Sequence, residues 1–305
     1  MLSQLLQRLQ TDNTSGATAL LDLAIEILET FAEHTSSAHP DDFMYALEGL
    51  VGALIAAQPS MAVMINLAQH VLQACAGEPP AADAQQQLRH ALTAFRQQVR
   101  QGLAALCQQA LSVLPAQATI LTYSNSATVI AALQTAQAHG RVRRVILSES
   151  RPSYDGRLQA KALIEHGIAV EYGIDMALFE RLAEVQVVLV GADAVFAHGL
   201  VNKLGTHALV QLAGLHGIPV FSLCTSNKYL PAAAGSLFRI AAHDPAEVWP
   251  DAPGGLEVRN VYFDTTPLPL FTGIISEREV HTPAALRQEL EQQQLAPALL
   301  RLVSG

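Results

Sequence analysis

The chain has little cysteine, little charge, few aromatic residues and no long apolar run. Its 305 residues include only three cysteines, Cys75, Cys107 and Cys224. They are too few and too scattered for a disulfide framework or a zinc cluster, and we expect neither a metal nor another cofactor. No apolar segment reaches the roughly 18 residues of a membrane span, and residues 1–16 show no secretion signal. We therefore predict a cytoplasmic protein that does not cross a membrane.

The charge balance is acidic, with a net charge of −9. This value argues against a broad nucleic-acid surface, so no direct nucleic-acid partner is expected, although one local basic pocket is compatible with it. Half of the residues are hydrophobic, which is enough to bury a large core. The length fits one large domain or two ordinary ones.

The two parts of the chain differ in pattern. Residues 1–115 carry helical apolar spacing, and the glutamine-rich stretch that Pro115 ends reads as one long helix. From residue 116 onward six short apolar runs alternate with helical patterns. These runs are TILTYS, RRVILSES, GIAVEY, VVLVGAD, IPVFSLC and NVYFD. The alternation predicts an α/β fold, with a helical amino-terminal domain (1–115) followed by a doubly wound parallel sheet (116–305).

The most informative stretch is VVLVGADAVFAHGLVNKLGT, residues 187–206. Its apolar beginning is typical of a central strand covered on both faces, and Gly191 ends that strand just before Asp193. Ligands of open α/β sheets bind outside the carboxyl ends of the strands. Asn202 and Lys203 follow before a new helix near Thr206, so an acid, an amide and an amine are expected at this edge.

Other predicted strands also end in polar residues. Ser124, Asn125 and Ser126 precede a helix, where they form either a phosphate cradle or a plain helix cap. Arg151 either holds a phosphate or pairs with a neighbouring carboxylate, Glu149 or Asp155. The run that ends at Cys224 continues to Lys228, and Cys224 itself is expected to be a small buried hydrophobe.

Two amino-terminal segments are read as helix starts. DNTSGAT, residues 12–18, contains Ser15 and Gly16, which form either a turn or an anion-binding nest. QPSMAVMINL, residues 58–67, has a proline where a first helical turn is expected.

Five motifs in one order carry a resemblance to a known family. TYSNSATV, SESRPSYDGRLQAKAL, VGADAVFAHGLVNKLGTHALVQLA, FSLCTSNK and FDTTPLPLFTGIISE resemble the alpha/beta/delta subunit family of translation initiation factor 2B. That family includes isomerases of ribose 1,5-bisphosphate and methylthioribose 1-phosphate. The resemblance covers residues 119–285 strongly and the two amino-terminal segments more weakly. It implies a helical domain before a Rossmann-like domain, and a homodimer or higher homo-oligomer built through the carboxyl-terminal domain.

The resemblance also implies roles for single residues. The isomerases of the family use a cysteine and an aspartate, which match Ser124 and Asp193 of this chain as candidate catalytic residues. A serine hydroxyl needs a neighbouring base, whereas a thiol can be tuned toward neutral pH, so the serine is a departure that matters. The matching motifs imply a substrate-binding set made up of Gly16, Ala17, Asn125, Ser126, Arg151, Asn202, Lys203 and Lys228.

Two classes of function follow. In the first, the chain binds a sugar phosphate or a nucleotide phosphate in the crevice without isomerising it. In the second, it isomerises a phosphorylated pentose with Asp193 and another partner, for which Cys224, Tyr123 or a water is a candidate. The preserved phosphate-binding motifs and the serine at position 124 favour binding.

Overall fold

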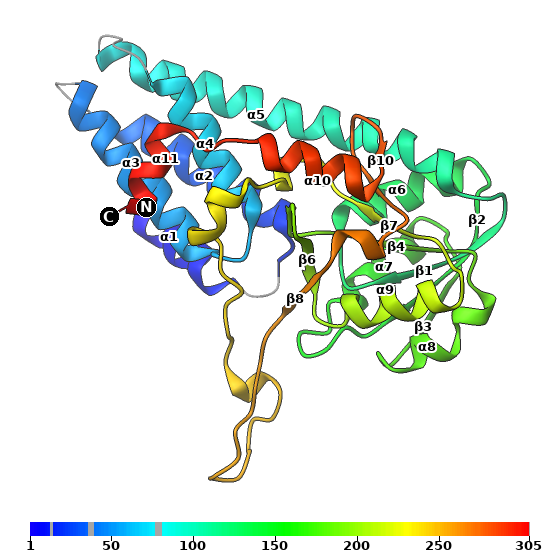
Figure 1. Cartoon of the computed structure of the whole chain (residues 1–305). Coiled ribbons are helices and arrows are strands. Elements are labelled where there is room, and N and C mark those ends of the chain that lie inside the picture. Colours follow the sequence, from blue (N-terminus) through cyan, green and yellow to red (C-terminus); the bar gives the residue numbers. More distant parts are fainter. Residues whose placement is uncertain (13–14, 36–39, 77–80, 305) are drawn as a thin grey trace.

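The computed structural model describes residues 1–12, 15–35, 40–76 and 81–304 (Figure 1). Five helices come first, followed by a large sheet with helices on both sides. The amino-terminal helices are α1 (Leu2–Thr11), α2 (Ala17–His34), α3 (Pro40–Ala57), α4 (Ala62–Cys75) and α5 (Ala81–Ala110). The chain passes to the sheet after a short 3-10 turn, Leu111–Val113. None of the described helices is long and apolar enough to cross a membrane.

The large sheet has seven strands in the order β10-β9-β7-β4-β1-β2-β3. Its parallel strands are β1 (Ala118–Tyr123), β2 (Val142–Ser148), β3 (Val170–Gly173), β4 (Val187–Val190), β7 (Val220–Leu223) and β9 (Gly273–Ile275). Only the edge strand β10 (Val280–His281) is antiparallel. Strand β4 is buried at all four positions, as expected of a central strand covered on both faces. The predicted α/β fold is confirmed.

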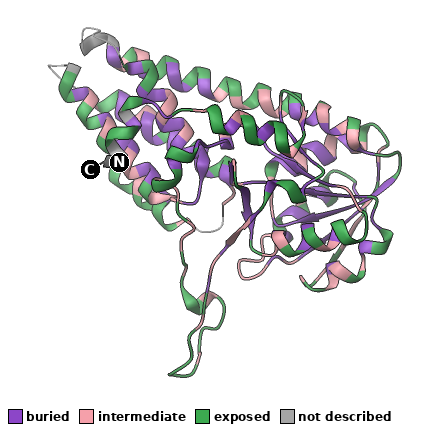
Figure 2. Ribbon diagram, in the orientation of Figure 1, coloured by how far each residue is buried: buried purple, intermediate pink, exposed green. Residues whose placement is uncertain are grey.

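Side chains that alternate along the strands divide the sheet into two covered faces. Ile120 of β1 packs with α5, α6 (Ala127–Ala138) and α7 (Gly156–Glu165). Its neighbour Leu121 packs on the other face with α8 (Ala177–Glu180), α9 (Thr206–Leu215) and α10 (Pro283–Gln292). Successive strand residues point to opposite faces, so one strand serves both cores. Figure 2 shows the strands buried and the outer helix faces exposed.

A smaller antiparallel sheet joins the helices to the large sheet. It consists of β5 (Ala194–Phe196), β6 (Gly199–Lys203) and β8 (Phe263–Thr266), in the order β5-β6-β8. The NVYFD segment was expected to add a strand to the parallel sheet, and that expectation is wrong because its end pairs with β6 instead. The segment between Asp193 and Thr206, for which the sequence predicted no strand, contains a hairpin.

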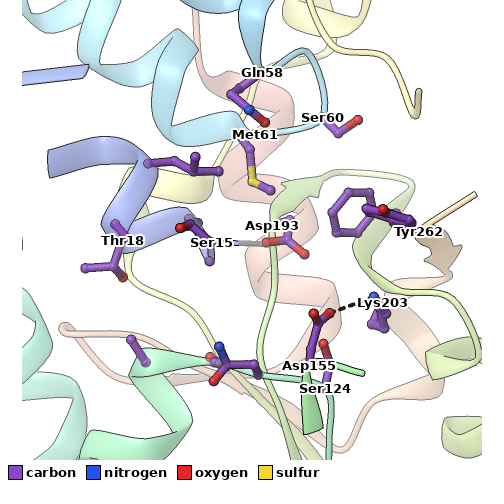
Figure 3. Close-up of a pocket in the computed structure, with 18 of the residues that line it drawn as sticks. Ser15, Thr18, Gln58, Ser60, Met61, Ser124, Asp155, Asp193, Lys203 and Tyr262 are labelled. Carbon is purple, nitrogen blue, oxygen red and sulfur yellow. Dashed lines mark hydrogen bonds and ion pairs between the residues drawn. The ribbon is translucent and has the colours of Figure 1, made fainter. Parts of the chain in front are cut away.

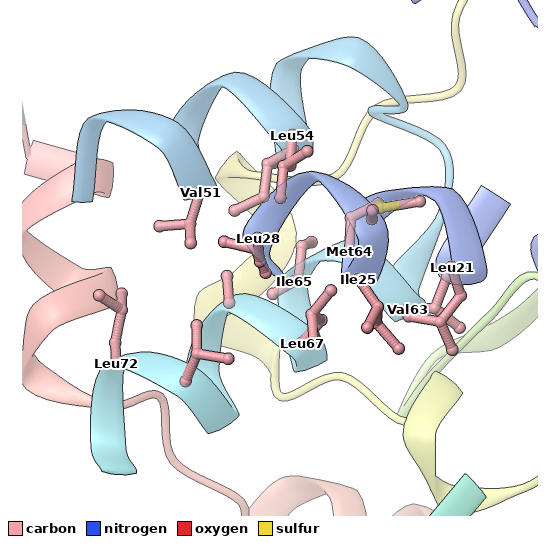
Figure 4. Close-up of a cluster of buried hydrophobic side chains, with 14 of the residues drawn as sticks. Leu21, Ile25, Leu28, Val51, Leu54, Val63, Met64, Ile65, Leu67 and Leu72 are labelled. Atoms are coloured by element: carbon pink, nitrogen blue, oxygen red, sulfur yellow. The ribbon is translucent and has the colours of Figure 1, made fainter. Parts of the chain in front are cut away.

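The helical layer has its own core, made by α1 to α4 and the first half of α5. Figure 4 shows the part of it that α2, α3 and α4 form. Phe196 and Val201 of the small sheet belong to this core, and so does Leu299 of the last helix, α11 (Pro297–Ser304). Helix α5 spans about 45 Å and is shared by both regions. Its residue Leu92 packs in the helical core, and Leu106 packs under the sheet. The division at residue 115 stays a prediction, since α5 and α11 tie the two regions together.

One segment projects from the body of the molecule. Residues 237–262, called the arm below, form the extended yellow-to-orange loop in Figure 1. A bridge between Ala242 and Val261 and a hydrogen bond from the His243 amide to the Asn260 carbonyl at 3.0 Å help to hold its two ends together. The arm carries Trp249, the only tryptophan of the chain, which is 46% exposed.

Candidate functional site

A cavity of about 610 Å³ lies between the helical layer and the carboxyl edge of the large sheet (Figure 3). One wall comes from the start of α2 and from the turn between α3 and α4. The other wall comes from the segments after β1 and β4, from the end of β6 and from the base of the arm. The edge that the sequence predicted as the ligand site therefore borders the cavity.

Asp193 lies at the centre of this cavity (Figure 3). Its backbone is fixed from both walls, because its amide donates to the Val201 carbonyl at 2.8 Å and its carbonyl accepts from the Ala62 amide at 3.1 Å. No described residue hydrogen-bonds to its carboxylate. Burial raises the pKa of Asp193, and the nearby Lys228 and Lys203 partly offset this rise. An acid of this kind suits a proton carrier or a group that binds a ligand hydroxyl.

Gly191 brings the end of β4 close to the start of α6. A methyl group on this glycine would lie 2.7 Å from the Ser126 Oγ and 2.9 Å from its Cβ. Such distances leave no room for a side chain, so the packing of β4 against α6 requires a glycine at position 191. The close approach sets Asp193 beside the first turn of α6.

Lys203 is almost fully buried, at 3% exposed, and is already paired. Its Nζ lies 2.6 Å from an Asp155 carboxylate oxygen and donates to the Ser153 hydroxyl at 2.6 Å. It also lies 4.8 Å from the centre of the Tyr262 ring. The ammonium is therefore held in place by an ion pair and a cation–π contact.

The other two candidates on this side of the cavity also have partners. Asn202 donates from Nδ2 to the Thr206 hydroxyl at 3.0 Å, within the turn that starts α9. Lys228, at the end of a 3-10 turn, donates to the Ala192 carbonyl at 2.5 Å. This bond directs the Lys228 ammonium to the residue before Asp193.

Two helices begin at the cavity. Gly16 is the N-cap of α2 and Ser126 is the N-cap of α6, where its hydroxyl accepts from the Val129 amide at 3.4 Å. A methyl group on Gly16 would lie 4.0 Å from the Asn125 carbonyl, so the two helix starts lie close together. Free amides at helix starts attract anions, and Ala17 lies in the first turn of α2. Asn13 and Thr14, within the predicted DNTSGAT start, lie outside the described residues.

Ser124 lines the cavity in an unusual backbone conformation, with φ of +69°. Its amide donates to the Ser150 hydroxyl at 3.0 Å, which holds the turn after β1. Left-handed backbone is uncommon for a non-glycine residue, and such strain is often found at functional sites. In this conformation the Ser124 side chain lies on the floor of the cavity near Asp155 (Figure 3).

Three residues considered from the sequence lie outside the residues that line the cavity. Arg151 pairs with neither candidate carboxylate, because its guanidinium bonds to the Tyr154 hydroxyl and to the Val248 carbonyl of the arm. Tyr123 donates to the Leu204 carbonyl at 2.7 Å, and burial raises its pKa. Cys224 is fully buried, as the sequence predicted, and burial raises its pKa to about 12. Among the described residues, no three His, Cys, Asp or Glu side chains could hold a metal ion.

Sequence reasoning missed the arm, and it read the segment before α4 only as a helix start. His243 and Tyr262 stack at 3.6 Å between ring centres and line the cavity from the base of the arm. Ser60, in the turn before α4, donates to the Arg239 carbonyl at 2.7 Å and so fixes the arm to the helical layer. No local pattern in the sequence marks these contacts, since they join segments about 180 residues apart.

The protein belongs to the class of α/β proteins in which a helical layer precedes a doubly wound sheet. The cavity between the two layers contains Asp193 and two lysines. The profile described as the initiation factor 2 subunit family matches residues 13–283. The chain belongs to this family, and the resemblance drawn from its motifs is confirmed.

Relatives with different described activities occur in the family. A ribose 1,5-bisphosphate isomerase of Methanocaldococcus jannaschii is 27% identical, over 91% of this chain and 90% of its own. A methylthioribose-1-phosphate isomerase of Chloroflexus aurantiacus is 34% identical, over 69% of this chain and 68% of its own. Among solved structures, the translation initiation factor eIF-2B of Pyrococcus horikoshii OT3 matches with a TM-score of 0.82 at 25% identity, over 95% of this chain and 98% of its own.

Proposed function

We propose that the chain binds a phosphorylated sugar in the cavity and does not isomerise it at an enzymatic rate. The observation that carries the proposal is the free Asp193 carboxylate, which shares one cavity with two lysines and two helix starts. Helix-start amides and ammonium groups suit a phosphate, and a carboxylate suits sugar hydroxyls. Relatives named for two sugar-phosphate substrates support this ligand class over a nucleotide.

The described lining of the cavity contains no cysteine beside Asp193, which argues against rapid isomerisation. The resemblance implies a cysteine where Ser124 stands, and a serine hydroxyl needs a base to act. Cys224 and Tyr123, the two side chains considered as substitutes, bond to backbone carbonyls outside the cavity lining. Their raised pKa values keep both protonated at neutral pH.

Calorimetry on the wild type and on a Lys203→Ala variant tests the binding. We expect methylthioribose 1-phosphate to bind the wild type and to bind the variant at least tenfold more weakly, because a buried cation beside the ligand is lost. Lys161→Ala is the matched control, since Lys161 is exposed on α7. Equal binding by all three proteins, or no binding by any of them, would refute the proposal.

A second candidate function is the isomerisation itself, with Asp193 as the proton carrier and a water or the Ser124 hydroxyl as its partner. The raised pKa of Asp193 favours this alternative, because an acid–base catalyst works best when its pKa lies near the working pH. NMR of the wild type with methylthioribose 1-phosphate or ribose 1,5-bisphosphate separates the two. We expect no conversion by the wild type and a trace by Ser124→Cys. Rapid turnover that Asp193→Asn abolishes would make the chain an isomerase.

We also propose that the chain is cytoplasmic, where sugar phosphates occur, and that it forms a homodimer through its carboxyl-terminal region. The family resemblance of FDTTPLPLFTGIISE supports this interface. Exposed apolar side chains nearby also support it, among them Leu204 and Leu270, 42% and 37% exposed. A solved eIF2B-beta2-delta2 complex with the same fold is tetrameric. Light scattering should give at least a dimer at micromolar concentration, and a monomer would count against the proposal.

A further inference from the structure

A second, smaller pocket of about 160 Å³ shares no described lining residue with the cavity discussed so far. Its wall is made by α4, α5, the 3-10 turn Ser226–Lys228 and Glu277, which follows β9. Lys228, the last residue of the turn, lines the larger cavity, so this turn borders both. At about 30 Å³ per water molecule, the second pocket has room for roughly five waters or a ligand of similar size.

Glu277 makes the second pocket electronegative. It is the only acidic side chain in the described lining, which contains neither lysine nor arginine. The Arg278 guanidinium lies 4.0 Å from the Glu277 carboxylate, but it is 55% exposed and bonds to Glu289 at 2.6 Å. Water screens such an exposed charge, so Arg278 offsets the Glu277 charge only weakly. The second pocket therefore favours a cation over an anion.

The polar wall of the second pocket offers hydrogen-bond acceptors. Glu277 accepts from the Ser226 amide at 3.0 Å and from the Ser226 hydroxyl. A carboxylate has about four acceptor positions, so about two remain. Asn66 uses both hydrogens of its Nδ2, for the Asn227 carbonyl at 2.8 Å and the Tyr229 carbonyl at 3.0 Å. No described residue donates to the Asn66 Oδ1. An occupant that donates several hydrogen bonds therefore fits this wall.

Two aromatic rings complete the second pocket. His70 of α4 and Phe95 of α5 both line it, and their ring centres lie 5.1 Å apart. Flat organic cations such as a guanidinium pack well on aromatic surfaces, and they also carry several N–H donors. Charge, hydrogen bonding and shape thus point to the same kind of occupant.

We infer that the second pocket binds a small organic cation of the guanidinium type. The cation donates to the Glu277 carboxylate and to the Asn66 Oδ1, and it packs against the His70 and Phe95 rings. Its site lies beside the turn that ends at Lys228. The inference does not rest on the proposed function, because it concerns a different pocket.

Methylguanidinium and methylurea are matched probes, because they have the same number of non-hydrogen atoms and nearly the same shape but differ in charge. Both are titrated against the full chain by ligand-observed NMR, at one ionic strength and at pH 8, where imidazole side chains are largely uncharged. We expect methylguanidinium to bind about tenfold more tightly, since a charge-assisted hydrogen bond is stronger than a neutral one.

Gln98 allows the charge of the second pocket to be changed at an exposed position of its lining. Gln98→Glu should tighten methylguanidinium binding about threefold, and Gln98→Lys should weaken it about threefold. Gln97 is the matched control, because it is exposed on the same helix and lies outside the described lining. The same two substitutions at Gln97 should change the affinity by less than about twofold.

Equal affinity for the two probes, or binding of neither, would overturn the inference. Equal effects of the Gln97 and Gln98 substitutions would also overturn it, because a diffuse attraction to the acidic chain would then explain the binding. Glu277→Gln should remove the preference for methylguanidinium. This variant also loses part of the hold on Ser226, so the Gln98 pair decides the inference if Glu277→Gln does not fold.

Discussion

The two walls of the cavity differ in what they contribute. The helical wall, with Ser15, Gly16 and the turn at Gln58 to Met61, presents helix-start amides and mostly neutral side chains, together with the carboxylates of Asp12 and Asp22. The sheet wall carries Asp193, Lys203 and the other charged groups nearest the centre of the cavity. Charged side chains gather there because the carboxyl ends of parallel strands meet at one edge. The difference teaches that both lysines of the described lining come from the sheet side, whereas the helical wall supplies shape and anion-binding amides.

The largest effect on stability is expected from replacing Lys203, a cation of the sheet wall. Lys203→Met leaves the partly buried Asp155 without its partner, and such a loss costs about 3 kcal/mol of unfolding free energy. Chemical denaturation of the purified variant measures this cost. Lys161→Met, which removes an exposed lysine of α7, should change the unfolding free energy by less than about 0.5 kcal/mol. Similar losses of unfolding free energy in both variants would mean that the Lys203–Asp155 ion pair does not stabilise the fold more than an exposed lysine does.

Replacing one glycine on each wall allows the tightness of packing at the two walls to be compared. Gly191→Ala on the sheet wall places a methyl group 2.7 Å from the Ser126 Oγ, and overpacking of this kind costs about 2 kcal/mol. Gly16→Ala on the helical wall meets nothing closer than 4.0 Å at a φ of −74°, and the loss of a glycine cap costs less than about 1 kcal/mol. Chemical denaturation of the two variants under the same conditions shows which substitution lowers the unfolding free energy more. A larger loss at Gly16 would contradict the close packing of β4 against α6.

A smaller effect, opposite in sign, is expected at Asp193. Its pKa is raised in the folded protein, so the ionised carboxylate costs stability above the raised pKa, and this cost disappears below the ordinary carboxyl pKa. Asp193→Asn should therefore raise the melting temperature at neutral pH, by about 2 °C. The gain should shrink as the pH falls from the raised pKa to the ordinary one. Melting curves of both proteins across that range check the sign, and a variant less stable than the wild type at neutral pH would refute it.

The sheet wall was more predictable from the sequence than the helical wall. The run at Val187 to Val190 is long enough and β-branched enough to mark a buried strand, and Asp193 follows it directly. The hairpin of β5 and β6 was not predicted because its strands are short and the second one carries the polar residues Asn202 and Lys203. The fold class was correct because it depends on the alternation of whole segments rather than on single boundaries.

Side-chain direction and distant contacts were the parts that the sequence could not give. Arg151 follows a strand at the predicted edge, but its side chain turns to Tyr154 and to the arm. A strand end fixes where a residue lies and not where a long side chain points. His243 and Tyr262 reach the cavity only through the fixed base of the arm, which depends on contacts between distant segments. The roles of the predicted site residues stay predictions.

Hydrogen–deuterium exchange with and without methylthioribose 1-phosphate tests most directly whether one sugar phosphate contacts both walls. Binding should slow exchange at the start of α2, residues 15–20, and at the two segments of the sheet wall, residues 124–130 and 191–203. The exposed arm residues around Trp249 should exchange at the same rate in both conditions. Slower exchange on both walls together is the predicted result. Slower exchange outside these segments only, or no change at a saturating sugar concentration, would contradict the account.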